Sequence, residues 1–111
     1  MVDSTGRVVL CTFGTADDAA RIARILVEER LAACVNIAKP VRSIYTWQGT
    51  VHDEAETLAI IKTTAERFEA LRVRLVELHP YDVPEVIALP ILESHAPYLA
   101  WLVDAVRPTS M

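Results

Sequence analysis

The hydrophobic pattern of the chain centres on residues 34–63, which predict two long β-strands. Apolar, β-branched and aromatic residues fill the runs 34–47 and 51–63, and such side chains suit a pleated, half-buried surface. Gln48 and Gly49 separate the runs and predict a hairpin turn, because glycine adopts a positive φ without steric strain. At roughly 3.3 Å per residue each arm spans about 40 Å, whereas a compact chain of this size has a radius of gyration of about 13 Å. We therefore expect the hairpin to project from its own subunit and to pair with other copies of the chain.

Pro40 interrupts the first arm of this hairpin. Proline has no N–H to donate to a β-ladder, which confines it to edge strands and bulges. The apolar alternation also changes here, because Val35 and Val41 share one parity whereas Ile44 has the other. We expect a β-bulge at this point.

The pattern outside the hairpin predicts two more strands and three helices. Residues 7–13 form a nearly continuous apolar run, which is typical of a central strand buried on both faces. Thr15 and Thr63 each stand three residues before an acidic residue, a spacing that favours the start of a helix. Prolines mark several of the remaining boundaries. The expected elements are a strand at 7–13, a helix from 15 to about 31, strands at 34–47 and 51–63, a helix from 63 to 80, a strand at 84–91 and a helix from about 97 to 108.

This order, β-α-β-β-α-β-α, predicts an α+β protein of the ferredoxin-like βαββαβ type with an extra C-terminal helix. Right-handed crossovers place the first two helices on one face of a four-stranded antiparallel sheet. The other face stays uncovered, and we expect the third helix and neighbouring subunits to cover it. Residues 1–6 are interpreted as a loose N-terminal leader and residues 7–108 as a single domain.

Composition narrows the class of protein. Hydrophobic residues make up 52% of the sequence, which is enough for a sizeable core. No apolar run approaches the ~18 residues that span a bilayer, and the N-terminus lacks the pattern of a secretory signal, so we expect a cytoplasmic protein without a membrane partner. The net charge of −4 and the lack of a Lys/Arg run argue against a nucleic-acid partner. Cys11 and Cys34 form no CxxC pair and are expected to be reduced thiols.

Five blocks of the sequence, in the same order, are similar to one known family. The blocks are Arg30-Leu31-Ala32-Ala33-Cys34-Val35-Asn36-Ile37, Ser43-Ile44-Tyr45-Thr46-Trp47-Gln48-Gly49, Ile61-Lys62-Thr63, the run from His79-Pro80-Tyr81 to Leu89-Pro90-Ile91, and Tyr98-Leu99-Ala100-Trp101. Over about residues 7–107 the chain resembles the CutA divalent-cation tolerance proteins. The resemblance implies a ferredoxin-like homotrimer related in architecture to the PII signalling proteins. It also implies unusual thermal stability, binding of copper or other divalent metals, and a link to metal tolerance.

The resemblance further implies a metal site. Family members that bind copper use a Cys at the end of the first strand and a His before Pro-Tyr, which correspond to Cys11 and His79 here. The expected topology places the last strand beside the first, so the two residues can be neighbours, and thiolate with imidazole suits Cu(I) or, in part, Cu(II). Some members carry a second His where this chain has Leu78, which puts a third ligand in doubt. The alternatives are a buried core thiol for Cys11 and a helix-terminal residue for His79.

Six residues are candidates for a cleft between subunits. The aromatic residues of this set either line a pocket or serve as packing and interface residues. The charged residues of the set stand in otherwise apolar strands, where charges tend to be paired or functional. The six are Tyr45, Trp47, Lys62, Tyr81, Glu85 and Trp101. Near the hairpin tip, His52 with Asp53, Glu54 and Glu56 forms either a set of metal ligands or a solvated strand face.

Two functions are compatible with these expectations. The first is a trimeric, non-catalytic divalent-cation tolerance protein that binds copper or another divalent metal ion. The second is a PII-like sensor or scaffold that binds a small molecule or a partner protein at clefts between subunits. A Cys-His hydrolase would also need an orienting third group and an oxyanion site, and the sequence indicates neither.

Overall fold

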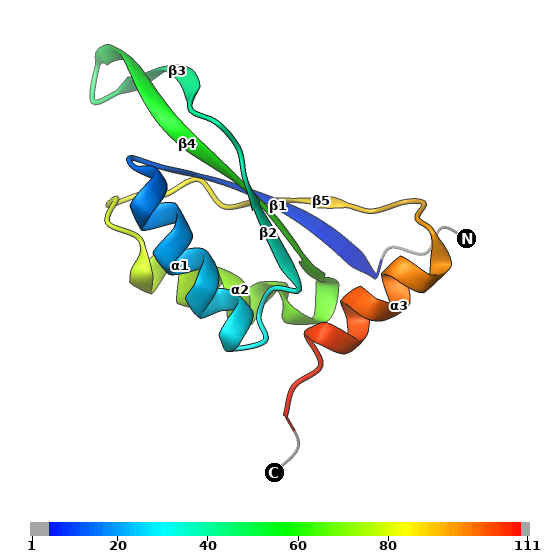
Figure 1. Ribbon diagram of the computed structural model, residues 1–111. Helices are drawn as coiled ribbons and strands as arrows, with labels where there is room; N and C mark the ends of the chain where they lie inside the picture. The colour runs from blue at the N-terminus through cyan, green and yellow to red at the C-terminus, as the bar shows by residue number, and fades with distance from the viewer. Residues whose placement is uncertain (1–4, 110–111) are drawn as a thin grey trace.

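The computed structural model describes residues 5–109 and has an α+β fold (Figure 1). Its elements are β1 (Gly6–Phe13), α1 (Ala16–Glu28), β2 (Cys34–Ile37), β3 (Val41–Trp47), β4 (Thr50–Thr64), α2 (Ala65–Leu78), β5 (Ile87–Pro90) and α3 (Ala96–Ala105). The strand order is β2-β4-β1-β5, and each neighbouring pair is antiparallel. This arrangement confirms the predicted ferredoxin-like fold with an extra C-terminal helix. Of the predicted leader, residues 1–4 lie outside the described residues, and Gly6 is the first residue of β1.

Strand β4 links the body of the molecule to the projecting hairpin. Its inner half, residues 57–64, pairs with β1, and residues 59–62 also pair with β2 on the other side. Its outer half, residues 50–56, pairs with β3 alone, so the hairpin leaves the body as a two-stranded ribbon (Figure 1). The Cα radius of gyration is 14.7 Å, above the roughly 13 Å of a compact chain of this length. The predicted projection is therefore confirmed.

The turn of the hairpin has the predicted two residues. Trp47 pairs with Thr50, and between them Gln48 and Gly49 have φ values of 51° and 80°. Positive φ at both central positions defines a type I′ turn, whose twist matches that of the flanking strands.

The bulge predicted at Pro40 is also present. From Ile37 to Val41 the first arm advances four residues, whereas β4 advances three between their partners, Ala59 and Glu56. One extra residue therefore stands on the first arm, and Pro40 lies within the break. As a result the first arm is two strands, β2 and β3, and not the single strand expected over residues 34–47.

The main core lies between one face of the sheet and the helices α1 and α2. Alternate residues of β1 face these helices and are fully buried, and the apolar stripes of the helices pack against them. The principal core residues are Val9, Cys11, Phe13, Ile22, Leu26, Ile61, Leu71 and Leu75.

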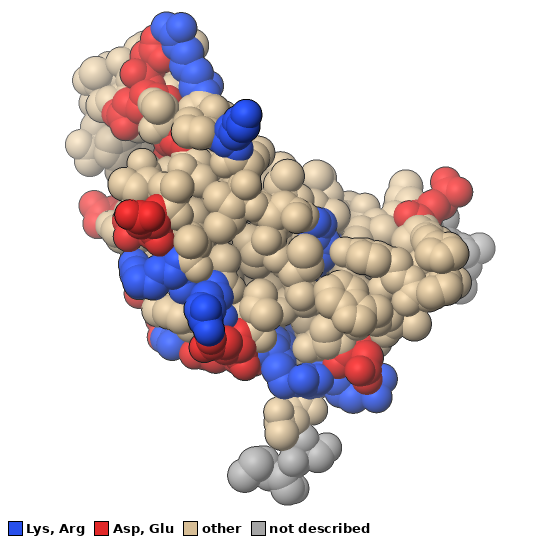
Figure 2. Space-filling view, in the orientation of Figure 1, with Lys and Arg blue, Asp and Glu red and all other residues tan. Residues whose placement is uncertain are grey.

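The opposite face of the sheet is uncovered over much of its area, as expected. We call it the open sheet face; the register places on it Val8, Leu10, Leu58, Ile60, Lys62, Ile87 and Leu89. Ile87 and Leu89 are each 50% exposed. Helix α3 lies at the end of the molecule opposite the hairpin tip (Figure 1), and a broad area nearly free of charged side chains separates α3 from the hairpin (Figure 2). In a single chain, only one face of β1 is therefore fully buried.

Two threonines cap the first two helices. The Thr15 hydroxyl accepts from the Asp18 N–H at 3.1 Å, as predicted for α1. For α2 the cap is Thr64, whose hydroxyl accepts from the Arg67 N–H at 3.2 Å, so the start predicted at Thr63 is one residue early. Thr63 is buried and its hydroxyl donates to a backbone carbonyl in the α1–β2 connection, because its side chain points to the core side of the sheet.

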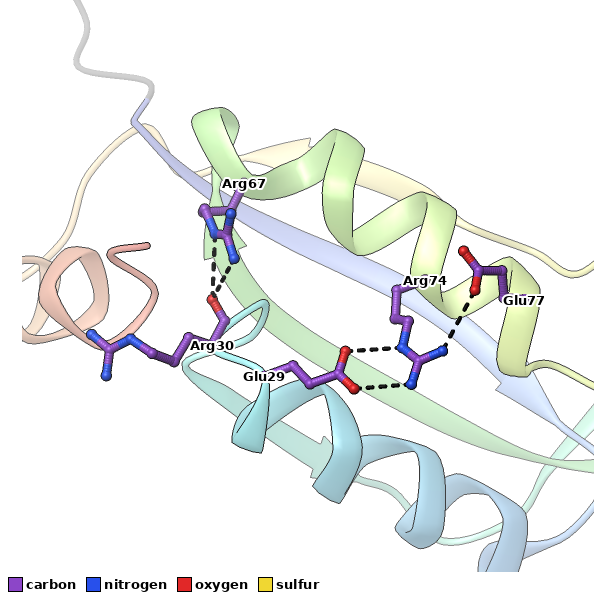
Figure 3. Close-up of polar contacts among 5 residues, drawn as sticks. All are labelled: Glu29, Arg30, Arg67, Arg74 and Glu77. Carbon is purple, nitrogen blue, oxygen red and sulfur yellow. Dashed lines mark hydrogen bonds and ion pairs between the residues drawn. The ribbon is translucent and has the colours of Figure 1, made fainter. Parts of the chain in front are cut away.

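Polar contacts fasten the end of α1 to both other helices. Arg74 of α2 forms a two-pronged ion pair with Glu29, with both N···O distances at 2.9 Å (Figure 3). Arg30 adopts a positive φ of 61°, and its guanidinium donates to the carbonyl oxygens of Asp104 and Arg107, each at 2.8 Å. The Asp104 carbonyl lies in the last turn of α3 and also accepts from the Arg107 N–H at 3.2 Å, and the Arg107 carbonyl lies two residues beyond the end of the helix. Arg30 therefore caps the C-terminal end of α3, which offsets the strained backbone at Arg30.

A candidate binding site at the base of the hairpin

Cys11 lies on β1 with its side chain on the core side of the sheet, and it is fully buried. Its sulfur is 3.8 Å from the carbonyl oxygen of Thr12. Burial raises the pKa of the thiol to about 12, and the negative charges of Glu85 and Glu56 add to the effect. The group is therefore a neutral thiol at neutral pH, and it must lose a proton before it can bind a metal.

His79 follows the last residue of α2 and has both ring nitrogens engaged. Nδ1 accepts from the Tyr81 N–H at 3.1 Å, so the proton of the neutral ring is assigned to Nε2, which donates to the Thr12 carbonyl oxygen at 2.8 Å. The ring stacks on Phe13 with centroids 4.5 Å apart. Burial lowers the pKa of His79, although the bond to Thr12 opposes this effect. The imidazole is therefore held neutral, without a free lone pair.

The structure brings Cys11 and His79 together around one backbone atom. Both side chains approach the carbonyl oxygen of Thr12, so the two residues are neighbours. Neither presents a ligand atom as it stands, since the thiol is protonated and the imidazole lone pair is used. Within residues 5–109, no group of three or more His, Cys, Asp or Glu side chains is placed to hold a metal ion. This conformation therefore does not fit a bound metal.

A groove of about 580 Å³ lies beside this pair, at the base of the hairpin. We call it the hairpin groove. One wall is the ribbon and the other is the connection between α2 and β5, with Thr12 between them. Its lining residues are Thr12, Ser43, Ile44, Tyr45, Trp47, Glu54, Glu56, Tyr81, Asp82, Val83 and Glu85. Four of the six predicted cleft residues are therefore gathered in it: Tyr45, Trp47, Tyr81 and Glu85.

Glu56 and Tyr81 join the two walls of the hairpin groove. The Tyr81 hydroxyl donates to Glu56 Oε2 at 2.7 Å. Burial and the nearby Glu56 carboxylate raise the pKa of Tyr81, so the hydroxyl keeps its proton and remains a donor. Glu56 is only 7% exposed. It therefore does not belong to a solvated strand face, because the α2–β5 connection folds over it.

The register places the hairpin groove on the same side of the sheet as the open sheet face. Thr12 pairs with Leu58, and Glu56 and Glu54 continue the same parity along β4. His52 continues it further, stacks on Tyr45 with centroids 5.2 Å apart, and lies 3.3 Å from Glu54. A copy of the chain that covered the open sheet face would therefore approach the groove.

Lys62 and Trp101 lie away from the hairpin groove. Lys62 stands on the open sheet face, with Nζ 4.0 Å from the sulfur of Cys34. Trp101 lies on α3, is 49% exposed and packs beside Tyr98 at a centroid distance of 5.5 Å. Within one chain these two residues do not join the other four, and their place in a cleft between subunits stays a prediction.

The fold and the groove define the class of protein. It is a small ferredoxin-like α+β domain with a projecting ribbon, an open sheet face and a groove of the size that holds a small molecule. Within residues 5–109, no helix is long and apolar enough to cross a membrane.

Comparisons with known proteins identify the family. The family model for the CutA1 divalent ion tolerance protein matches residues 7–105, so the chain belongs to this family, as its sequence blocks predict. The divalent-cation tolerance protein CutA of Thermus thermophilus is 53% identical over 95 residues, which are 86% of this chain and 92% of that protein. The rice protein CutA 1, chloroplastic, is 44% identical over 90% of this chain and 56% of its own length.

Solved structures of the family have the same fold. The Cut A1 structure from Thermus thermophilus has a TM-score of 0.89 and 49% identity, covering 92% of this chain and 99% of that one. The CutA1 structure from Oryza sativa has a TM-score of 0.90 and 41% identity, covering 96% of this chain and all of that one, 100%. The predicted fold and the predicted family are thus confirmed together.

Proposed function

We propose that this chain is a non-catalytic divalent-cation tolerance protein that works as a homotrimer and binds copper or another divalent metal ion. Membership of the family supports the role in tolerance. The chemistry of the pair at Thr12 supports the lack of catalysis. A thiol whose pKa is about 12 is a poor nucleophile at neutral pH, and an imidazole with both nitrogens engaged is no general base.

Self-association is supported by two apolar surfaces of the chain. On the ribbon, Ile44 is 66% and Val51 67% exposed, and on the open sheet face Ile87 and Leu89 are each 50% exposed. A two-stranded ribbon is marginally stable alone in water, and exposed apolar patches mark association sites. The register puts Ile44 and Val51 on the side of the strands opposite to the open sheet face, so the two surfaces are covered by separate contacts with sister copies. The number three comes from the family resemblance.

We place the metal, as cargo, between Cys11 and His79. Binding there requires the thiol to release its proton and the His79 ring to leave Thr12 or Tyr81, which frees a nitrogen lone pair. Cu(I) is the cation best suited to a thiolate and an imidazole. Because the thiol starts with a pKa near 12, the affinity should rise with pH.

Calorimetric titration with Cu(I) and Cu(II) at pH 6.5 and 8.0 tests this site. We expect saturable binding that is tighter at the higher pH and that the double variant Cys11→Ala/His79→Ala loses. Cys34→Ala is the matched control, since Cys34 lies on the other side of the sheet, and it should bind like the wild type. Absence of saturable binding, or undiminished binding in the double variant, would exclude the site.

The hairpin groove favours a second candidate function, a PII-like sensor or scaffold that binds a small molecule or a partner protein. Its volume of about 580 Å³ lies within the range of about 300–1,000 Å³ that small-molecule sites occupy. A thermal-shift screen of metabolites tests this function. A hit should raise the midpoint of unfolding of the wild type and lose its effect when groove residues are changed; a screen without groove-dependent hits speaks against it.

We also place the protein in the cytoplasm. Cys11 and Cys34 are both free thiols, and their strand positions put them on opposite sides of the sheet, where they cannot join. Free thiols are usual in a reducing compartment. Fractionation of cells that produce the protein tests this placement, and recovery outside the cytoplasmic fraction would contradict it.

A further inference from the structure

The hairpin groove combines aromatic faces with carboxylates. Tyr45, Trp47 and Tyr81 supply the rings, and the acidic residues are Glu54, Glu56, Asp82 and Glu85. Among the described residues that line the groove there is no lysine, arginine or histidine. Aromatic faces attract cations, and a concave site lined by charge of one sign concentrates ligands of the opposite sign.

Glu56 supplies a second and independent observation, because it is a buried carboxylate without a cationic partner. It is 7% exposed, and its Oε2 accepts from Tyr81. Within the described part of the chain no ion pair includes Glu56, and no hydrogen bond reaches its Oε1. Every fully buried side-chain oxygen or nitrogen there has a partner, so Oε1 is in contact with the groove. Buried charges are normally paired, and this one lacks its cation.

Two basic groups of the ribbon do not fill this role. Arg42, on the ribbon, has the opposite strand parity to Tyr45 and binds both carboxylate oxygens of Asp53, at 2.8 and 2.6 Å. His52 lies against Glu54 at 3.3 Å, nearer the tip than Glu56. Within one chain, the negative charge of the groove is therefore left without a cationic partner.

A single metal ion does not fit the arrangement of the carboxylates in the hairpin groove. Within residues 5–109 the carboxylates are too widely spaced for three of them to converge on one ion, whereas the groove has the volume of an organic molecule. An extended cation can place separate charges near separate carboxylates and lay its methylene groups along the aromatic rings.

We propose that the hairpin groove binds an organic cation with two or more amino groups, of the polyamine class. This inference rests on the second proposed function, the small-molecule sensor, and names its ligand. One ammonium group binds Glu56 Oε1, and another lies near Glu85 and Asp82. The chain between them packs on Tyr45 and Trp47, whose faces add cation–π attraction.

Calorimetric titration with spermidine, on the full chain in its native oligomer at about 50 mM salt, tests the proposal; low salt limits screening. We expect saturable binding. Glu56→Gln and Glu85→Gln should each weaken it about tenfold, because each removes a charged hydrogen-bond acceptor. Trp47→Leu should weaken it about threefold through the lost ring face. Glu85 is exposed, so its variant reports on binding even if Glu56→Gln folds poorly.

Three comparisons decide the result. Glu93→Gln is the matched control, because it removes the same charge from an exposed residue outside the groove; an equal loss in this variant would mean general attraction to an acidic surface and would overturn the proposal. Equal binding of Mg²⁺ at matched ionic strength would overturn the extended organic ligand, and equal binding of the neutral octane-1,8-diol would overturn its cationic class; in either case the groove would remain a binding site. If no small molecule of any class binds, the sensor function fails as well. Copper binding at Cys11 and His79 is measured separately in Glu85→Gln; it should be retained and slightly tighter, because the variant removes a negative charge that raises the pKa of the Cys11 thiol.

Discussion

At the scale of single residues, the protonation of His79 links the site to the stability of the fold. Burial lowers the pKa of the ring, while Thr12, Asp18 and Glu56 oppose the shift without reversing it. In the unfolded chain His79 has an ordinary pKa of about 6.5. As the pH falls below that value, the unfolded chain takes up a proton before the folded chain does. The stabilisation from the neutral ring is therefore complete above pH about 6.5 and is lost as the pH falls through the folded pKa.

His79→Gln should reduce this acid sensitivity. Glutamine stays neutral and keeps both a donor and an acceptor for the contacts with Thr12 and Tyr81. Urea unfolding at several pH values between 7.5 and 5.0 is the measurement. We expect the free energy of unfolding of the wild type to fall more steeply with acidification than that of the variant. Parallel curves would show that other groups carry the pH dependence.

The sequence predicted which side chains of the candidate site lie near one another, but not their contacts with the backbone. The order of the strands was enough to predict that Cys11 and His79 are neighbours. The engagement of both His79 nitrogens was not predictable, because the partners are backbone groups of Thr12 and Tyr81. Glu56 was missed as a buried residue for a similar reason, since a connection more than twenty residues later in the chain covers it. The sequence could not predict whether Trp101 and Tyr45 lie in one cleft, because a contact between them would require a second copy of the chain.

At the scale of elements, the ribbon depends on the backbone conformation of its turn. Gly49 has φ of 80°, and a Cβ added there would meet no atom within 4 Å. Gly49→Ala therefore isolates backbone strain from steric contact. We expect it to lower the free energy of unfolding by about 1 kcal/mol, measured by chemical denaturation.

Gln48→Gly is the matched control for that prediction. Gln48 also has a positive φ, 51°, so glycine there removes strain and should leave the stability unchanged or slightly raised. A loss of stability in both variants would mean that side chains of the turn are engaged elsewhere, which would contradict the assignment of strain to the backbone.

Most elements could be predicted from local signals, and the misses have local causes. The Gln48-Gly49 turn, the Thr15 cap and the bulge at Pro40 all follow from the chemistry of one or two residues. Two adjacent threonines, 63 and 64, compete for the cap of α2, and only the strand parity of Thr63, which sends its side chain into the core, decides between them. β5 begins at Ile87 and not at residue 84, although β1 continues to Phe13, three residues beyond Leu10, the ladder partner of Ile87.

At the scale of the whole molecule, the proposed trimer predicts how the protein sediments. The wild type should behave at low micromolar concentration as a species three times the 12.3 kDa of one chain. Leu89→Glu places a charge on the half-exposed open sheet face, and burial of an unpaired charge opposes association. We expect this variant to shift to smaller species in analytical ultracentrifugation.

Val76→Glu is the control for the trimer prediction. Val76 is an apolar residue of α2 with 40% exposure, close to that of Leu89, but it lies on the helical side of the molecule. Its variant should sediment like the wild type. A wild-type protein that sediments as a single 12.3 kDa subunit would remove the basis for any cleft between subunits.

The continuity of strand β4 has a consequence for the stability of the assembly. The same uninterrupted backbone runs from the centre of the sheet to the tip of the ribbon, so there is no joint at which the ribbon could swing while the body stayed rigid. In the proposed assembly, a sister molecule that packs against the ribbon therefore also stabilises the central strand in the core of its neighbour. Dissociation and melting should then occur as one event, and resistance to heat would be a property of the assembly.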